Sequence, residues 1–526
     1  MVKFVSRRDF LNLLAATGGS AALLRVGTAL KMLPGSASAA TLDLLHLGSN
    51  QRKVAILGGG ISGLTVAYEL SRRGYDCTIL EASHRCGGRI LTLRHGDLVD
   101  EIGNRHYCEF DDAPHMYFNA GAARIPSTHR NLLAYCKELE IELEVFVNEN
   151  KTSFFQDDNM LGGMPIRNID YTTNMRGFMA EFMAKAMTEA ELDSPFTDPE
   201  AETLLGMIRS FGDLSENNLY KGSFRAGYAQ GGFLEHGVQK DMIAFRDLLK
   251  SPLGRQVMGA SEGETGPILM QPVGGMDKIV DGFLNHVGEQ VKYRAMVTSV
   301  QVAEDGVNVS YDQDGVRQSL EVDYCFNCIP THLMVGVEHN FPSDYVKAMK
   351  HVRRGEAYKA AFQAKHRFWE DMDIYGGISW SNTKSRQLWY PTHGIHKAKG
   401  VVLGAYDYGG GMYHTVMSQE DRIEAHLKDH EKIHPNFREL VEKPVTIGWH
   451  RMNHMLGCSA RWSRRFGEAM TQEEEALYRT LQDPVNGRHY FIGDQISMHA
   501  AWQESAVMSA QWALDHMDAQ VRAKLA

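Results

Sequence analysis

The chain has 526 residues, too many for one small core, so two or three domains are predicted. Hydrophobic residues make up 43% and charged residues 23%, as in a soluble globular protein. The net charge of -10, together with the lack of a basic run interleaved with aromatic residues, argues against nucleic acid as a partner. The seven cysteines are an odd and sparse set, so no disulfide framework is predicted.

The first forty residues have the features of a targeting segment. Ser6-Arg7-Arg8-Asp9-Phe10-Leu11 fits a twin-arginine export signal, and Ala37-Ser38-Ala39 offers an A-x-A cleavage site. Arg25 interrupts the apolar stretch between them well before the roughly eighteen residues of a membrane anchor. We therefore predict a signal peptide over residues 1–39, export to the periplasm or secretion, and no transmembrane segment.

A strand, a glycine-rich turn and a helix follow one another from Lys53. The apolar run 54–57 suits a buried strand, Gly58-Gly59-Gly60-Ile61-Ser62-Gly63 fits G-x-G-x-x-G, and helical spacing continues over 64–73. A second strand, 77–80, ends on Glu81, about twenty residues past the glycines. The glycines alone would also fit an ordinary strand-to-helix turn, but the flanking strands and the terminal acid favour a dinucleotide site.

Each part of this unit has a separate task in binding a dinucleotide. Gly58 allows the tight turn, Gly60 lets the backbone approach a pyrophosphate, and Gly63 lets the helix pack closely on the strand. The N-terminus of the helix presents free N–H groups to the phosphates. Glu81 is placed to accept hydrogen bonds from ribose hydroxyls.

The next residues indicate which dinucleotide is bound. Arg85-Cys86-Gly87-Gly88-Arg89 resembles the R-x-G-G-R run of the flavin amine oxidase family, where it lies along the pyrophosphate and flavin of FAD. The resemblance therefore implies FAD, bound non-covalently, and a glutathione-reductase-type FAD domain.

Three further motifs resemble the L-amino acid oxidases of this family, including the snake-venom enzymes. Gly121-Ala122-Ala123-Arg124-Ile125-Pro126 matches G-x-x-R-[IL]-P, whose arginine grips the substrate carboxylate. Lys359-Ala360-Ala361-Phe362 precedes Phe368-Trp369-Glu370 at the spacing where the family lysine holds a water against flavin N5. Ser385-Arg386-Gln387-Leu388-Trp389-Tyr390-Pro391 matches S-R-x-x-Y-Y-P, whose second tyrosine binds the carboxylate. A guanidinium fork suits a flat carboxylate independently of the resemblance.

The end of the chain departs from the family pattern in two places. The family has G-E where this chain has Gly493-Asp494, so the acidic side chain is one methylene shorter here. Asp494 is still expected to accept a hydrogen bond from the ribityl chain of FAD. Trp502 keeps the family spacing of eight residues past the acid. Ala501 replaces a glycine of the venom enzymes and is expected to tighten the carboxylate end of the pocket.

The resemblance assigns the following residues, by their positions in this chain. Catalytic roles fall on Lys359, Arg124, Tyr390 and Trp502. The substrate is contacted by Arg124, Tyr390, Ala501 and Trp502. FAD is contacted by Gly58, Gly60, Ile61, Ser62, Gly63, Glu81, Ala82, Gly88, Arg89, Ala123, Arg124, Val297, Gly493, Asp494 and Trp502. No metal site is expected.

The expected fold is α/β, with a Rossmann-type FAD domain, a mixed-sheet substrate domain and a helical insert. The FAD domain is expected over 51–90, 271–352 and 483–526, with an antiparallel meander made of strands 295–302, 307–311 and 320–329. The substrate domain is expected over 91–165 and 353–482, and the helical domain over 166–270.

The resemblance implies oxidation of an L-amino acid by FAD and oxygen, giving a 2-oxo acid, ammonia and hydrogen peroxide, in a protein that is a homodimer. One alternative is an oxidase of primary amines or polyamines, which has no carboxylate to bind. A second, from another class, is a non-catalytic flavoprotein that carries electrons.

Three patterns are interpreted as structural. Four methionines at four-residue spacing, from Met175 to Met187, are more typical of a core stripe than of a cofactor site. His426, His430 and His434 share a helix face that favours a solvated surface over a metal site. Cys325 and Cys328 are read as core thiols that point to opposite faces of a strand.

Overall fold

The computed structural model describes residues 42–45, 52–189, 197–254, 258, 263–463 and 469–525. The signal peptide expected over residues 1–39 lies outside the described residues. Within those ranges, no helix is both long enough and apolar enough to cross a membrane.

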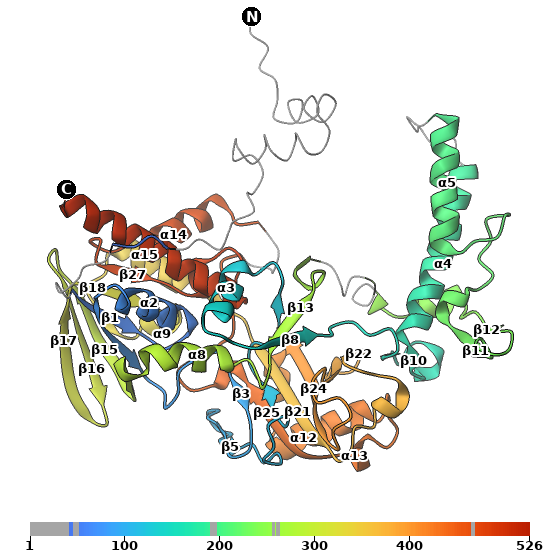
Figure 1. The fold of residues 1–526 in the computed structure, drawn as a ribbon, viewed down its shortest axis with the longest axis horizontal. Helices are drawn as coiled ribbons and strands as arrows, with labels where there is room; N and C mark the ends of the chain where they lie inside the picture. The colour runs from blue at the N-terminus through green and yellow to red at the C-terminus, as the bar shows by residue number, and fades with distance from the viewer. Residues whose placement is uncertain are drawn as a thin grey trace, which may run out of the picture.

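A five-stranded parallel sheet forms the centre of the first of two bodies (Figure 1). In spatial order its strands are β14 (Val291–Tyr293), β2 (Asp76–Glu81), β1 (Lys53–Leu57), β18 (Tyr324–Asn327) and β27 (His489–Phe491). These strands come from all three segments assigned to the FAD domain. Their near-continuous burial is typical of a parallel sheet that is covered on both faces.

Helices cover one face of this sheet, and a meander with two more helices covers the other. The first layer contains α2 (Ile61–Ser71), α8 (Lys278–Val287) and α15 (Gln503–Leu525). The second contains β15 (Ala295–Val302), β16 (Val307–Gln313), β17 (Val316–Val322), α10 (Ser343–His351) and α14 (Gln472–Gln482). The three layers share two apolar cores, one on each face of the sheet.

Two sequence predictions are corrected here. The strand expected over 320–329 is two strands, because the chain leaves the meander at Asp323, and β18 joins the parallel sheet beside β1. Helix α14, expected to belong to the substrate domain, instead places Leu477 and Leu481 in the core beneath the parallel sheet. The apolar side chains of α14 are buried there against α10, which packs alongside it.

The second body is built on a seven-stranded mixed sheet. In spatial order its strands are β10 (Ile166–Arg167), β9 (Phe154–Gln156), β22 (Gly377–Ser381), β23 (Gln387–Tyr390), β24 (Gly400–Tyr408), β21 (Ala357–Ala364) and β25 (Val441–Gly448). Helices α12 (Gln419–His430) and α13 (Phe437–Leu440) cover the face of this sheet that points away from the parallel sheet. A three-stranded sheet lies at the junction of the two bodies: β7 (Ile125–Pro126), β13 (Leu269–Pro272) and β8 (Leu143–Phe146).

A helical arm projects from the second body (Figure 1). It consists of α4 (Asn168–Glu189), α5 (Asp198–Gly212), the hairpin β11 (Tyr228–Gln230) and β12 (Val238–Gln239), and α6 (Phe245–Leu248). The methionine stripe of α4 is only partly core: Met175 is buried, but Met179 and Met183 are nearly half exposed. The core interpretation is therefore wrong for those two residues, because α5 covers only one side of α4.

Candidate functional site

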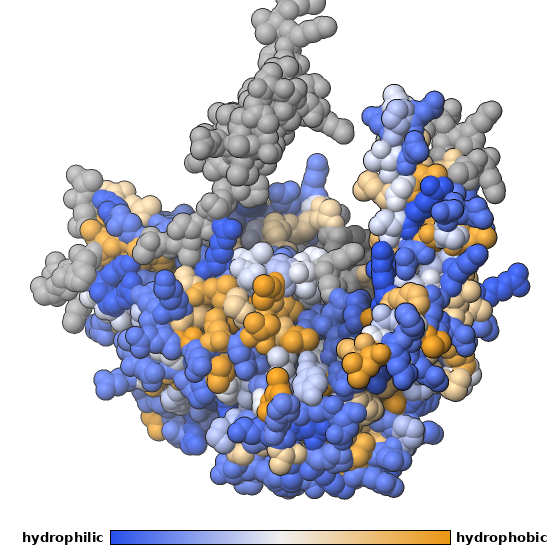
Figure 2. Space-filling view, turned by 45° about the vertical axis from the view of Figure 1, so that its right-hand side comes forward, coloured by the Kyte–Doolittle hydropathy of each residue, from blue (hydrophilic) through white to orange (hydrophobic). Residues whose placement is uncertain are grey.

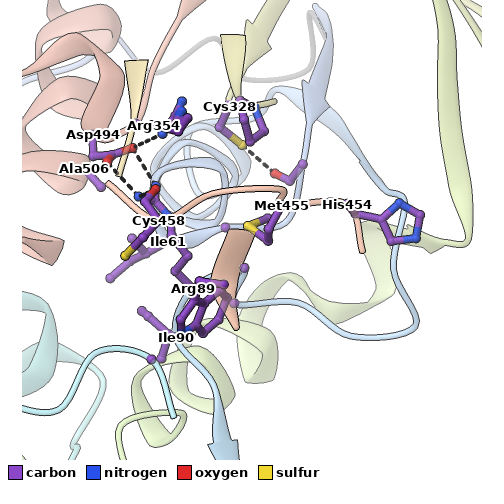
Figure 3. Close-up of a pocket in the computed structure, with 18 of the residues that line it drawn as sticks. Ile61, Arg89, Ile90, Cys328, Arg354, His454, Met455, Cys458, Asp494 and Ala506 are labelled. Atoms are coloured by element: carbon purple, nitrogen blue, oxygen red, sulfur yellow. Dashed lines mark hydrogen bonds and ion pairs between the residues drawn. The ribbon is translucent and has the colours of Figure 1, made fainter. Parts of the chain in front are cut away.

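One cavity of about 1000 Å³ runs between the two bodies. It starts at the turn between β1 and α2 and ends against the seven-stranded sheet, where residues of β21, β23 and β24 line it. Figure 3 shows part of its wall, with Ile61, Arg89, Cys328 and Asp494 from four distant parts of the chain around one space.

The glycine turn at one end of the cavity is shaped for a phosphate group. Gly58 has a φ of +103°, which favours glycine, and a Cβ on Gly63 would lie 2.2 Å from the Gly58 carbonyl oxygen. A Cβ on Gly60 would meet nothing within 4 Å, so the space in front of this residue is open. Backbone can therefore approach a ligand at Gly60, next to the N–H groups that open α2.

Glu81 closes the same end of the cavity. Its carboxylate accepts hydrogen bonds from the backbone N–H of Gly59 at 2.7 Å and of Ser83 at 2.8 Å. Each oxygen keeps a second lone pair, so ribose hydroxyls can also donate to it.

Basic side chains outnumber carboxylates in the lining, which suits an anionic ligand such as the pyrophosphate of FAD. The basic residues are Arg89, Arg124, Arg354, Lys359 and Arg461, and the carboxylates are Glu81 and Asp494. The open space at Gly60 and this charge excess both fit the cofactor expected from the sequence. The glycine turn, Glu81 and Arg89 would hold it.

Asp494 organises two of these arginines (Figure 3). It accepts hydrogen bonds from Arg89 at 2.6 and 2.5 Å, from Arg354 at 3.2 Å and from the N–H of Ala460 at 2.8 Å. Burial opposes its charge, but Arg89 and Arg354 hold its pKa well below the ordinary value. These bonds occupy all four acceptor positions. The expected ribityl contact is therefore corrected: the carboxylate positions two arginines.

Lys359 lies at the other end of the cavity, on β21. Its Nζ donates to the carbonyl oxygens of Asn119 at 3.0 Å and Gly121 at 2.6 Å. Burial, and next the charge of Arg124, lower the pKa of Lys359 to about 7. When neutral, the amine uses both N–H groups on these carbonyls and keeps a lone pair for a proton or a water.

Arg124 is the other cation at this end. Its Nη1 donates to Asn148 Oδ1 at 2.8 Å, and its guanidinium carbon lies 4.9 Å from the centre of the Trp389 ring. Removal from water lowers its pKa, and within the described residues no ion pair with a carboxylate offsets this effect. A guanidinium that is partly withdrawn from water without an anion is unfavourable, so this end of the cavity suits an anionic ligand group.

Tyr390, expected to bind the same carboxylate, lies outside the cavity. Its hydroxyl is 2.8 Å from Ser379 Oγ and 2.7 Å from His434 Nε2, and its ring is buried on the opposite face of the sheet. Successive side chains of a strand alternate between faces, so Trp389 faces the cavity and Tyr390 does not. The prediction for Tyr390 is therefore wrong.

Trp502 and Ala501 line the cavity, as expected. The Trp502 ring meets His129 edge-on, with the ring centres 5.0 Å apart. Ala501 has a φ of +78°, in the left-handed region that favours glycine, so the venom-type glycine is replaced at some backbone strain.

Most residues assigned from the sequence do line this one cavity. They are Gly58, Gly60, Ile61, Ser62, Glu81, Ala82, Gly88, Arg89, Ala123, Arg124, Val297, Lys359, Gly493, Asp494, Ala501 and Trp502. Gly63 lies behind the turn, where it serves packing. The sequence reasoning missed Arg354, Trp389, Tyr406, Trp449 and Arg461, which also line the cavity. Tyr406 and Tyr408 lie two residues apart on β24 and both line the cavity, so the alternation of that strand could have found part of this wall.

The solvated face expected for His426, His430 and His434 is wrong. All three histidines are buried, in α12 and in the loop that follows it. His426 lies 3.0 Å from the Tyr358 hydroxyl and 2.8 Å from Ser385 Oγ, while His430 meets the Gly404 carbonyl. No cluster of His, Cys, Asp and Glu suited to a metal ion occurs within the described part of the chain.

Cys325 is a core thiol, as expected, but Cys328 lines the cavity.

The family model for flavin containing amine oxidoreductases matches residues 61–513, and that for pyridine nucleotide-disulphide oxidoreductases matches residues 6–106. The chain is 27% identical to the flavin-dependent L-tryptophan oxidase of Lentzea aerocolonigenes, over 89% of this chain and 98% of that protein. It is 26% identical to an L-amino acid oxidase of Bothrops pictus, over 88% and 89%.

The fold is similar to that of solved amine oxidases. The structure of putrescine oxidase bound to putrescine aligns with a TM-score of 0.57 at 19% identity, covering 90% of this chain and 99% of that one. Cyclohexylamine oxidase from Brevibacterium oxydans aligns with a TM-score of 0.59 at 16% identity, covering 90% and 100%. The protein is therefore a flavin oxidoreductase with FAD as its cofactor, and the chain belongs to the flavin containing amine oxidoreductase family.

Proposed function

We propose that the protein oxidises L-amino acids with oxygen, giving a 2-oxo acid, ammonia and hydrogen peroxide. The observation that carries this proposal is the partly buried guanidinium of Arg124, which has Asn148 and Trp389 as neighbours but no carboxylate partner among the described residues. An α-carboxylate would supply the missing anion through two parallel hydrogen bonds.

The residues around Arg124 have separate tasks in this reaction. Arg124 fixes the carboxylate, and Trp502 forms the wall of the same end of the cavity, so the Cα is held in one orientation. When bound, FAD supplies the hydride acceptor and the route by which oxygen is reduced to peroxide. Lys359, with a pKa of about 7, exchanges a proton at Nζ near neutral pH and can hold a water there.

An oxidase of primary amines or polyamines is the first alternative, and it is supported by the structural similarity to putrescine oxidase. An amine without a carboxylate would place a second cation beside the partly buried Arg124 and supply no anion, which disfavours this alternative. A non-catalytic electron carrier is the second alternative. An electron carrier does not require a lysine of lowered pKa beside its cofactor. It also does not require a cavity that extends from the glycine turn to Lys359.

The experiment that tests the proposal is a peroxide assay of the purified holoenzyme across the L-amino acids, the D-amino acids and their decarboxylated amines. Turnover should be confined to L-amino acids. Turnover of putrescine or another amine, with none of any amino acid, would replace the proposal by the first alternative, and no peroxide from any substrate would favour the second.

We also propose that the protein is exported folded through the twin-arginine route, on the basis of Arg7 and Arg8. Changing both to lysine should leave the precursor in the cytoplasm. Unimpaired export of that variant would contradict the route.

A further inference from the structure

Three segments that are distant in the chain meet behind Trp502. At the right of Figure 2 the arm projects from the rest of the molecule, and the chain returns from it through the turn η3 (Gly263–Thr265) to β13. Glu264 lies on this return. The other two segments are the residues just before α3 (Arg130–Glu138) and the loop 497–502, which leads into α15. The part of the cavity wall that Trp502 forms therefore lies at a junction of all three segments.

The Glu264 carboxylate joins the other two segments to its own. One of its oxygens lies 3.0 Å from Nε2 of His129, and the other lies 3.1 Å from Nε2 of His499. A carboxylate only accepts hydrogen bonds, so each histidine donates its Nε2 proton to it. Removal from water lowers the pKa of His129, so the ring that Glu264 holds at neutral pH is uncharged. We call these three side chains the Glu264 clamp.

His129 connects the clamp to Trp502. Its buried ring meets the Trp502 ring edge-on, with the ring centres 5.0 Å apart and the planes at 86°. Among the residues that the structure describes, no other aromatic ring contacts Trp502. A neutral imidazole can carry its proton on either nitrogen, and the hydrogen bond to Glu264 fixes both the proton and the orientation of the ring. His129 does not line the cavity, so it acts on a ligand through Trp502.

The loop that carries Trp502 depends on contacts of this kind. Ala501 has a φ of +78°, and such a conformation persists only where the surroundings over-determine it. Two carboxylates bracket the loop. Glu504 is buried and accepts hydrogen bonds from two backbone N–H groups of α3, at 3.0 and 2.7 Å. Glu264 holds the other side through His499, but its side chain is 35% exposed, so it is the weaker of the two anchors.

We propose that Glu264 is a positioning residue: the Glu264 clamp holds the Trp502 ring in the orientation that shapes the cavity around the substrate. None of the three side chains of the clamp lines the cavity, so each acts on turnover through the wall. Orientation matters because a displacement of about 1 Å can lower a rate about a hundredfold. The inference rests on the proposed function only for the identity of the substrate.

A double-mutant cycle on the holoenzyme separates positioning from general support of the fold. Glu264→Ala should lower kcat/KM about tenfold for whichever substrate gives peroxide. In a Trp502→Ala background the same change should have less than a twofold effect, because no ring remains to be positioned. Equal losses in the two backgrounds would overturn the proposal. Glu264→Gln keeps one acceptor oxygen and should recover part of the loss.

Glu442→Ala is the matched control for these measurements. Glu442 is 31% exposed and also contacts two side chains, Lys399 and Gln363, but it lies on β25 and does not line the cavity. Its removal should leave kcat/KM within twofold of the wild type. A loss as large as that of Glu264→Ala would contradict a specific role for the clamp.

Hydrogen exchange of the substrate-free holoenzyme tests the clamp without any reaction. Glu264→Ala should speed amide exchange in residues 497–502 about tenfold or more and leave α2 unchanged, while Glu442→Ala should change neither. Unchanged exchange in residues 497–502 would overturn the proposal. If Trp502→Ala loses its flavin, this measurement decides alone. Turnover of amines instead of amino acids would contradict the proposed function but leaves this expected result intact.

Discussion

The two faces of the seven-stranded sheet have opposite chemistry, although they share the same strands. On one face Lys359 and Trp389 line the cavity, where neither Lys359 nor Arg124 forms an ion pair with a carboxylate of the described residues. On the other, Tyr358 and Tyr390 belong to a closed network in which hydroxyl groups meet neutral histidines. On the first face, charged side chains lack an oppositely charged partner that a ligand could supply. On the second face, the polar groups already contact one another. The difference separates residues that should govern turnover from residues that should govern stability.

Arg124→Ala should give the largest effect on the cavity side. Losing the partner of a buried carboxylate should cost about 2–5 kcal/mol, or roughly thirty- to several-thousand-fold in kcat/KM for an L-amino acid. Arg124→Lys should recover only part, because a point charge cannot form both parallel hydrogen bonds. The decarboxylated amine is the control, and its poor turnover should not fall further. Equal losses on both substrates would mean that Arg124 supports the fold or the flavin instead.

Lys359→Met should slow a flavin half-reaction by about 10²-fold, while substrate binding changes little. In the wild type the lysine loses its proton as the pH rises through about 7, because burial and Arg124 lower its pKa. A step that needs the neutral amine should therefore accelerate up to that pH and then level off. Stopped-flow rates between pH 5.5 and 9 should show this titration in the wild type only. A wild-type profile in the variant would remove Lys359 from the reaction.

Tyr390→Phe should lower the stability of the fold and leave turnover unchanged. It leaves Ser379 and His434 without their shared hydroxyl, which should cost about 1–3 kcal/mol of unfolding free energy. The value of kcat/KM should not change. Trp389→Phe is the matched variant from the same strand and should lower kcat/KM for amino acids, because Arg124 rests on that ring. Urea denaturation and steady-state kinetics measure both quantities, and a Tyr390→Phe variant with weakened substrate binding would restore the role expected from the sequence.

These two neighbours show what the sequence could and could not predict. The glycine turn and Glu81 were predictable, because their function depends on backbone geometry within one short stretch of chain. The alternation of Trp389 and Tyr390 was also readable, but the face that meets the cavity is set by contacts between distant segments. The same is true of Asp494, whose partners Arg89 and Arg354 lie more than a hundred residues away. Burial of His426, His430 and His434 could not be read from their polar neighbours in the sequence.

These buried histidines should make the free energy of unfolding decrease at acidic pH. Burial, and then His430 and Arg167, lower the pKa of His434 to about 3, whereas it is about 6.5 in an unfolded chain. Between these values the unfolded chain binds a proton that the native state does not. Stability is therefore lost as the pH falls below 6.5, by up to about 1.4 kcal/mol per unit. Urea midpoints between pH 7 and 4.5 should fall less steeply in His434→Gln, while His84→Gln, at an exposed site, should match the wild type.

Ala501→Gly should give the smallest effect, on the cavity side. An alanine in the left-handed region costs about 1–2 kcal/mol, and glycine removes that strain but adds about 0.4–1 kcal/mol of unfolded-state entropy. The net result should be a gain of about 0.5 kcal/mol, with faster turnover of bulky substrates because the Cβ no longer lines the cavity. Ala500→Gly is the matched control, because Ala500 is not among the residues of positive φ, and it should lose stability. Thermal midpoints of the holoenzymes measure both. If the two variants lose stability equally, the backbone at Ala501 is not strained.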